Sequence, residues 1–113
     1  MENKETWYSR TAILLGAESI EKLENATVAV FGIGGVGGFA AEALARSGVG
    51  NLELIDHDTV SVSNINRQIV ALCSTVGKYK EDVMKDRILD INPKINVTAH
   101  KCFYLPETAG QFD

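Results

Sequence analysis

Residues 27–38, Thr-Val-Ala-Val-Phe-Gly-Ile-Gly-Gly-Val-Gly-Gly, contain the pattern that decides the fold. The first five are mainly apolar and β-branched, which predicts a strand buried on both faces of a helix-covered parallel sheet. The glycines that follow have the G-x-G-x-x-G spacing of a phosphate-binding turn between a strand and a helix. We expect Gly32 to permit the tight turn, Gly34 to let the backbone approach phosphates, and Gly37 to allow close helix packing.

Apolar periodicity and turn residues predict the other elements. The predicted helices span 6–15, 17–24, 36–47, 64–72 and 80–92, and the predicted strands span 27–31, 51–55 and 95–100. The order β-α-β-α-β after a helical N-terminal arm predicts an α/β fold with a Rossmann-like parallel sheet, one half of a doubly wound domain. We assign 1–25 to the arm, 26–105 to the nucleotide-binding half and 106–113 to a tail, and expect all of it to be the N-terminal part of a larger domain.

The composition is that of an ordinary globular protein. The chain has 113 residues, of which 45% are hydrophobic and 23% charged, and this excludes disorder, collagen and coiled coil. No apolar run approaches the roughly 20 residues that span a bilayer, and the first ten residues lack an apolar signal core. We therefore expect a cytoplasmic protein without membrane contact. Neither Cys73 nor Cys102 has a C-x-x-C partner, so we expect no metal site and place Cys73 in the core.

The net charge of −4 argues against a dedicated basic surface for nucleic acid. Charge is nevertheless distributed unevenly, since residues 64–101 contain 7 basic and 4 acidic side chains. A locally cationic segment in an acidic protein favours an anionic ligand.

Asp56 ends the second predicted strand, at the same edge of the sheet as the glycine turn. A carboxylate there is placed to accept the ribose hydroxyls of a nucleotide. Arg67 offers a bidentate fork for phosphate, and Lys80 at a helix start opposes the helix dipole unless an anion is bound. Together with Asn64 and the double glycine 34–35, these cations favour ATP. A half-domain that binds NAD and a non-enzymatic dimerisation module are the alternatives.

Several motifs together resemble the E1-like ThiF/MoeB/HesA activating enzymes, from about Trp7 to Leu105. They are Trp7–Arg10, 32–37, Asp56–Asp58, 63–68, 75–80 and 91–93. Segments 40–50 and 64–72 are most similar to one bacterial branch, whose members dehydrate N6-threonylcarbamoyladenosine in tRNA.

The resemblance implies ATP-dependent activation of a carboxylate. It implies that ATP is bound by the glycine turn (Gly32, Gly34, Gly35 and Gly37), by Asp56 at the ribose, and by Asn64, Arg67 and Lys80 at the phosphates. Arg67 and Lys80 match residues that stabilise the departing pyrophosphate, and Arg10 matches an arginine that reaches the partner subunit's site, which implies a homodimer.

The substrate implied by the branch is tRNA. Other branches adenylate the C-terminus of a ubiquitin-like sulfur carrier. The aspartate that binds Mg²⁺ in the family is expected beyond this chain, so we expect residues 1–113 alone to bind ATP weakly, if at all, and not to turn over.

Overall fold

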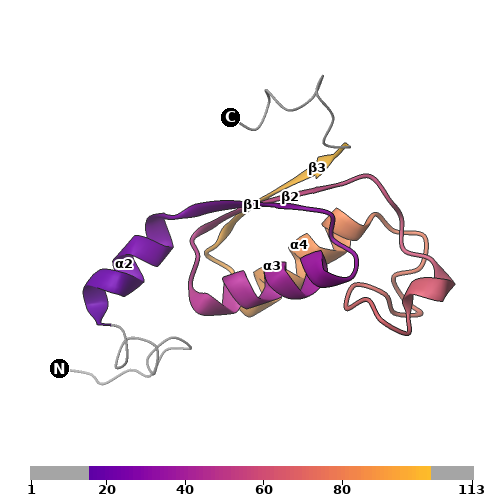
Figure 1. The fold of residues 1–113 in the computed structure, drawn as a ribbon, viewed down its shortest axis with the longest axis horizontal. Helices are drawn as coiled ribbons and strands as arrows, with labels where there is room; N and C mark the ends of the chain where they lie inside the picture. Colours follow the sequence, from indigo (N-terminus) through magenta and orange to yellow (C-terminus); the bar gives the residue numbers. More distant parts are fainter. Residues whose placement is uncertain (1–15, 103–113) are drawn as a thin grey trace.

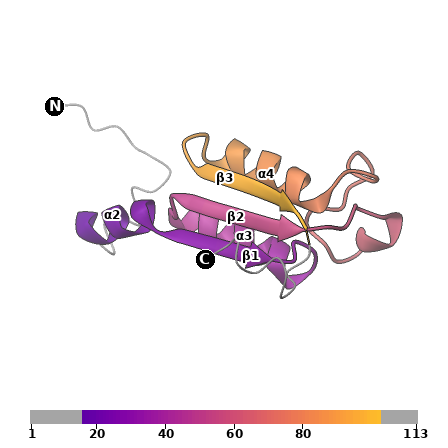
Figure 2. The ribbon, with the colours of Figure 1, turned by 90° about the horizontal axis from the view of Figure 1, so that it is seen from above.

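The structure is a computed structural model that describes residues 16–102. Its sheet has three parallel strands, β1 (Thr27–Phe31), β2 (Asn51–Asp56) and β3 (Asn96–Lys101), in the order β1-β2-β3. The three strands run side by side in Figures 1 and 2. This confirms the predicted α/β fold and the β-α-β-α-β order. The predicted helix 6–15 lies outside the described residues.

Two helices connect the strands and cover one face of the sheet. Helix α3 (Val36–Ser47) joins β1 to β2, and α4 (Lys80–Ile91) joins β2 to β3. Both lie on the same side in Figure 1, as successive parallel crossovers of one hand require. Helix α2 (Ala17–Asn25) precedes β1 and lies beyond the amino ends of the strands (Figures 1 and 2). No helix within residues 16–102 is long and apolar enough to cross a membrane.

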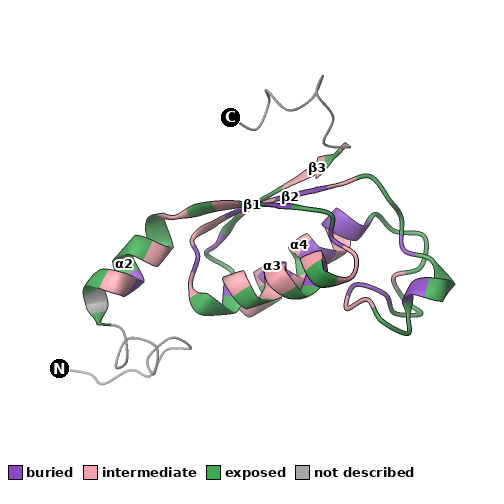
Figure 3. Ribbon diagram, viewed as in Figure 1, coloured by how far each residue is buried: buried purple, intermediate pink, exposed green. Residues whose placement is uncertain are grey.

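The hydrophobic core fills the space between the sheet and these two helices (Figure 3). Ala41 and Ala45 are fully buried on α3, and their small side chains let the helix lie close to the sheet. On α4, the larger side chains of Met84 and Ile88 are fully buried against the sheet. Val28, Leu52 and Val97 are in register and face this core. The predicted burial of strand 27–31 on both faces is wrong: Thr27, Ala29 and Phe31 are exposed, because the helices α3 and α4 cover only the other face.

The segment between β2 and α4 differs from the prediction. The predicted helix 64–72 is wrong: a 3-10 helix η1 (Val62–Asn64) is followed by turns. The hydroxyl of Thr75 donates to the carbonyl of Val70 (2.7 Å) and accepts from the N–H of Leu72 (2.8 Å). Such side-chain bonds to the backbone compete with the helical pattern. Cys73 follows these turns and is exposed, so its predicted place in the core is also wrong.

The long segment nevertheless returns to the end of β2. Thr59 forms an antiparallel bridge with Tyr79, and the N–H of Val60 donates to the carbonyl of Lys78 at 2.8 Å. The N–H of Lys80 donates to the carbonyl of Asp58 at 3.0 Å. These bonds hold the first turn of α4 beside the carboxyl end of β2.

Candidate functional site

The glycine turn joins β1 to α3 in a conformation that glycine favours. Gly32 and Gly35 have φ values of 84° and 53°, in the left-handed region. A Cβ on Gly37 would lie 1.7 Å from the carbonyl oxygen of Gly32, so the turn can close only with hydrogen at that position. Gly35 precedes α3 and makes no side-chain cap. The first N–H groups of α3 therefore form an end that favours an anion.

The carboxylate of Asp56 is bonded to this turn. Its Oδ2 accepts the main-chain N–H of Ile33 at 2.6 Å, and Oδ1 accepts the N–H groups of His57 (2.6 Å) and Asp58 (3.0 Å). The structure thus brings the glycine turn and Asp56 together in one crevice at the carboxyl ends of β1 and β2. The carboxylate is partly exposed there and keeps about one lone-pair site, on Oδ2, for a ligand.

Asn64 and Arg67 lie on the turns that follow β2. Asn64 is buried, and its Oδ1 accepts the N–H of Ser61 at 2.9 Å, so its amide oxygen is already used to hold η1. Only Nδ2 is available to a ligand without opening that turn. Arg67 is exposed, and its Nη1 donates to the carbonyl of Ser63 (2.9 Å) and to Oδ1 of Asn66 (3.0 Å). The rest of its guanidinium has no recorded partner within residues 16–102.

Two buried ionisable side chains begin α4. Lys80 is only 7% exposed, and no acceptor within residues 16–102 is recorded for its Nζ. Glu81 is fully buried, and neither of its carboxylate oxygens has a hydrogen-bond partner among the described residues. Burial raises the pKa of Glu81 above its ordinary value, and the neighbouring charges of Asp82 and Asp56 raise it further. The stem of Lys80 is buried, but its Nζ is not among the enclosed polar atoms, so the ammonium group stays within reach of a bound phosphate.

The sequence pattern did not single out Gln68 or Glu81. Gln68 lies against the glycine turn, because a Cβ built on Gly34 would be 2.7 Å from its Oε1. That oxygen is buried and has no hydrogen-bond partner among the described residues. The only signal for Gln68 in the sequence was its place beside Arg67 in the motif 63–68. Arg10 lies outside the described residues.

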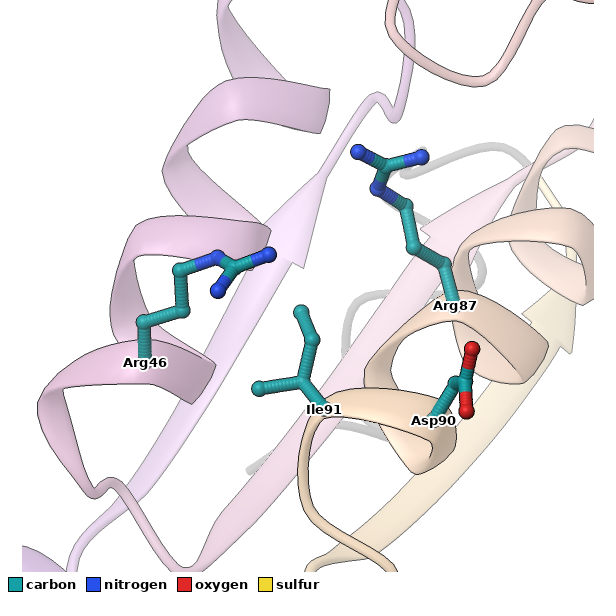
Figure 4. Close-up of a pocket in the computed structure, with 4 residues that line it drawn as sticks. All are labelled: Arg46, Arg87, Asp90 and Ile91. Carbon is teal, nitrogen blue, oxygen red and sulfur yellow. The ribbon is translucent and has the colours of Figure 1, made fainter. Parts of the chain in front are cut away.

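A pocket of about 560 Å³ between α3 and α4 lies elsewhere, since one of its lining residues, Arg46, is in the last turn of α3 and the glycine turn precedes the first. The pocket is lined by Arg46, Arg87, Asp90 and Ile91. Figure 4 shows Arg46 extending from α3 toward α4, which carries the other three residues. Glu42 binds both arginines: its Oε2 is 3.3 Å from Nε of Arg46, and its Oε1 accepts from Nε of Arg87. The pair with Arg87 connects α3 with α4, whereas the pair with Arg46 lies within α3, and the pKa of Glu42 is lowered, chiefly by its bond to Arg87.

Comparison with known proteins identifies the family. The sequence model of the ThiF family matches residues 8–112. The chain is 58% identical over 105 residues to tRNA threonylcarbamoyladenosine dehydratase of Bacillus subtilis (strain 168), covering 93% of this chain and 41% of that protein. It is 46% identical over 93 residues to molybdopterin-synthase adenylyltransferase of Salmonella typhimurium, covering 80% of this chain and 37% of that protein.

A solved structure agrees with the sequence comparison. E. coli tRNA N6-threonylcarbamoyladenosine dehydratase, TcdA, in complex with ATP superimposes with a TM-score of 0.90 at 44% identity, covering 99% of this chain and 47% of that one. The chain therefore spans less than half the length of the relatives it matches. Because the glycine turn, the fold and nearly the whole sequence agree, the chain belongs to the ThiF family.

Proposed function

We propose that this chain forms the ATP-binding part of an enzyme that adenylates a carboxylate, and that the carboxylate belongs to N6-threonylcarbamoyladenosine in tRNA. The observation that carries the choice of ATP is Lys80, whose stem is buried at the start of α4 and whose Nζ has no anionic partner among residues 16–102. A triphosphate beside the first turn of α4 would compensate that charge. A nicotinamide cofactor carries only a diphosphate, which the start of α3 can largely satisfy.

Each side chain has a distinct task in this proposal. The N–H groups at the start of α3 and the turn of Gly32, Gly34, Gly35 and Gly37 bind phosphate oxygens. Asp56 accepts a ribose hydroxyl with the lone pair on Oδ2 that its three backbone bonds leave. Arg67 and Lys80 stabilise the negative charge that develops on the leaving pyrophosphate, and Nδ2 of Asn64 donates beside them.

The reaction has two displacements. A carboxylate oxygen of the substrate attacks the α-phosphorus of ATP, and the bond to the bridging oxygen breaks as pyrophosphate leaves with the electron pair. The carbamoyl group of the same substrate then attacks the activated acyl carbon. AMP departs with the carboxylate oxygen, a proton is released, and the ring closes with net loss of water.

The described residues do not form a site for Mg²⁺ by themselves. Within residues 16–102 there is no cluster of at least three acidic, histidine or cysteine side chains that would hold a metal, and the oxygens of Asp56 are bonded to backbone N–H groups.

The substrate is supported by similarity and not by a contact. The relative from Bacillus subtilis is named a tRNA threonylcarbamoyladenosine dehydratase, and the superimposed E. coli enzyme was solved with ATP. Adenylation of a sulfur-carrier C-terminus is the second candidate, and the 46% identity to molybdopterin-synthase adenylyltransferase favours it specifically. We also propose that the protein works in the cytoplasm, where tRNA is, as a homodimer in which Arg10 reaches the partner's site.

Two experiments test this function. A thermal-shift titration of the chain with ATP and with NAD should show stabilisation by ATP that is lost in Arg67→Ala, because a ligand that binds only the folded state stabilises it. A shift with NAD alone would contradict the ATP proposal.

The substrate is tested in the source cell. After the gene is disrupted, mass spectrometry of tRNA nucleosides should show the open form of threonylcarbamoyladenosine in place of the cyclic one. If the cyclic nucleoside persists while a sulfur-carrier product is lost, the second candidate is correct.

A further inference from the structure

The space next to Gly34 is occupied by a side chain. A Cβ on Gly34 would lie 2.7 Å from Oε1, 2.9 Å from Cδ and 3.0 Å from Nε2 of Gln68, so the whole carboxamide lies against this glycine. The missing side chain of Gly34 therefore makes room for Gln68, at the place where backbone and phosphate were expected to meet.

The main chain holds Gln68 in this position. Its N–H donates to the carbonyl of Asn64 at 2.9 Å, and its carbonyl accepts the N–H of Ala71 at 3.0 Å. The side chain thus extends from an anchored turn, next to Arg67, toward the uncapped start of α3.

The hydrogen bonding of the carboxamide is incomplete. Oε1 is buried and has no partner among the described residues. A deprotonated phosphate accepts hydrogen bonds and donates none, so only Nε2 can bind it. A ribose hydroxyl or a lysine ammonium can supply the donor that Oε1 lacks.

We propose that Gln68 is a nucleotide-binding residue. Before ATP binds, its carboxamide lies against Gly34; when ATP binds, the carboxamide turns and donates Nε2 to a phosphate oxygen. This inference rests on the proposed function and names a residue beyond those assigned above. Binding of ATP relieves the unpaired burial of Oε1, so part of the affinity for ATP depends on Gln68.

The test measures by calorimetry how tightly the enzyme that contains this chain binds ATP and adenosine, which lacks phosphate. Gln68→Glu keeps the shape of the side chain and places a negative charge next to Gly34. We expect the affinity for ATP to fall about tenfold or more, while the affinity for adenosine changes less than about twofold. Gln68→Met removes both polar atoms, and we expect ATP affinity to fall about threefold to tenfold with no loss of melting temperature. Asn25→Asp, an amide-to-carboxylate change on exposed α2, is the matched control and should alter neither affinity.

The outcomes separate the two proposals. If the wild-type enzyme binds ATP, Arg67→Ala weakens binding and the Gln68 variants bind ATP normally, only the role of Gln68 is wrong. Equal losses for ATP and adenosine, with a lower melting temperature in Gln68→Met, would assign Gln68 a structural role and overturn this inference. If the wild-type enzyme that contains this chain binds adenosine and ATP equally weakly or not at all, both proposals fail.

Discussion

The N–H of Ile33 donates a 2.6 Å hydrogen bond to Oδ2 of Asp56 and so connects the glycine turn after β1 with the end of β2. A charged acceptor makes such a bond stronger than one between neutral groups. Because Oδ1 of the same carboxylate accepts two further N–H groups, Asp56 holds both sides of the crevice in place. The residue proposed to bind ribose is therefore also a structural element of the phosphate turn.

Asp56→Asn should lower both stability and nucleotide binding. The amide has no net charge and only one acceptor oxygen. It can therefore accept either from Ile33 or from His57 and Asp58, and losing the other contact costs about 1–3 kcal/mol. Urea denaturation measures the free energy of unfolding, and calorimetry measures ATP binding. Asp58→Asn, at an exposed neighbour, is the control and should unfold like the wild type. Unchanged stability in Asp56→Asn would show that the bond to Ile33 contributes little.

Lys80→Met should separate stability from binding. Methionine keeps the packing of the buried stem, and Nζ of Lys80 is not enclosed, so the free energy of unfolding is expected to change by less than about 1 kcal/mol. The same change should abolish the thermal shift produced by ATP. Lys78→Met, which alters an exposed lysine nearby, should keep that shift. A marked loss of stability in Lys80→Met would mean that the ammonium group is compensated within the protein.

The contribution of Glu42 to stability should disappear at acid pH. Its pKa is lowered in the folded chain, first by the hydrogen bond from Arg87, so the folded state binds a proton less readily than the unfolded state. The stabilisation is therefore present above the ordinary value of 4.5 and is lost as the pH falls below it. Glu42→Gln should cost about 0.5–1 kcal/mol at neutral pH and less at acid pH, as measured by urea denaturation at several pH values. An equal cost at every pH would contradict the ion-pair explanation.

The effect of Glu81 on stability should depend on pH in the opposite direction to that of Glu42. Burial raises its pKa, so the folded state binds a proton more readily, and stability falls as the pH rises from 4.5 through the raised folded value. Glu81→Leu should remove this dependence and stabilise the chain by about 1–3 kcal/mol at neutral pH, because no unpaired carboxyl remains buried. Exposed Glu21→Leu on α2 is the control for added apolar character. If Glu81→Leu destabilises the chain, the carboxyl has a partner in the native state.

The sequence by itself determined the features that depend on neighbouring residues. The strand 27–31, the glycine turn and helix 36–47 follow from local propensities, and Asp56 was placed because parallel strands end at one edge. The segment 64–72 was mispredicted since bonds from Asn64 and Thr75 to the backbone replace the helical pattern.

Only the tertiary structure decided which polar groups are buried and what they touch. Gln68 meets Gly34 because the segment after β2 folds back over the glycine turn, and no local pattern encodes a contact between residues so far apart in the chain. Lys80 and Glu81 are charged residues at a helix start, where exposure is the usual expectation. They are buried because backbone bonds at Asp58 and Val60 draw the start of α4 against the end of β2, and the packing of α4 on the sheet then closes over both side chains.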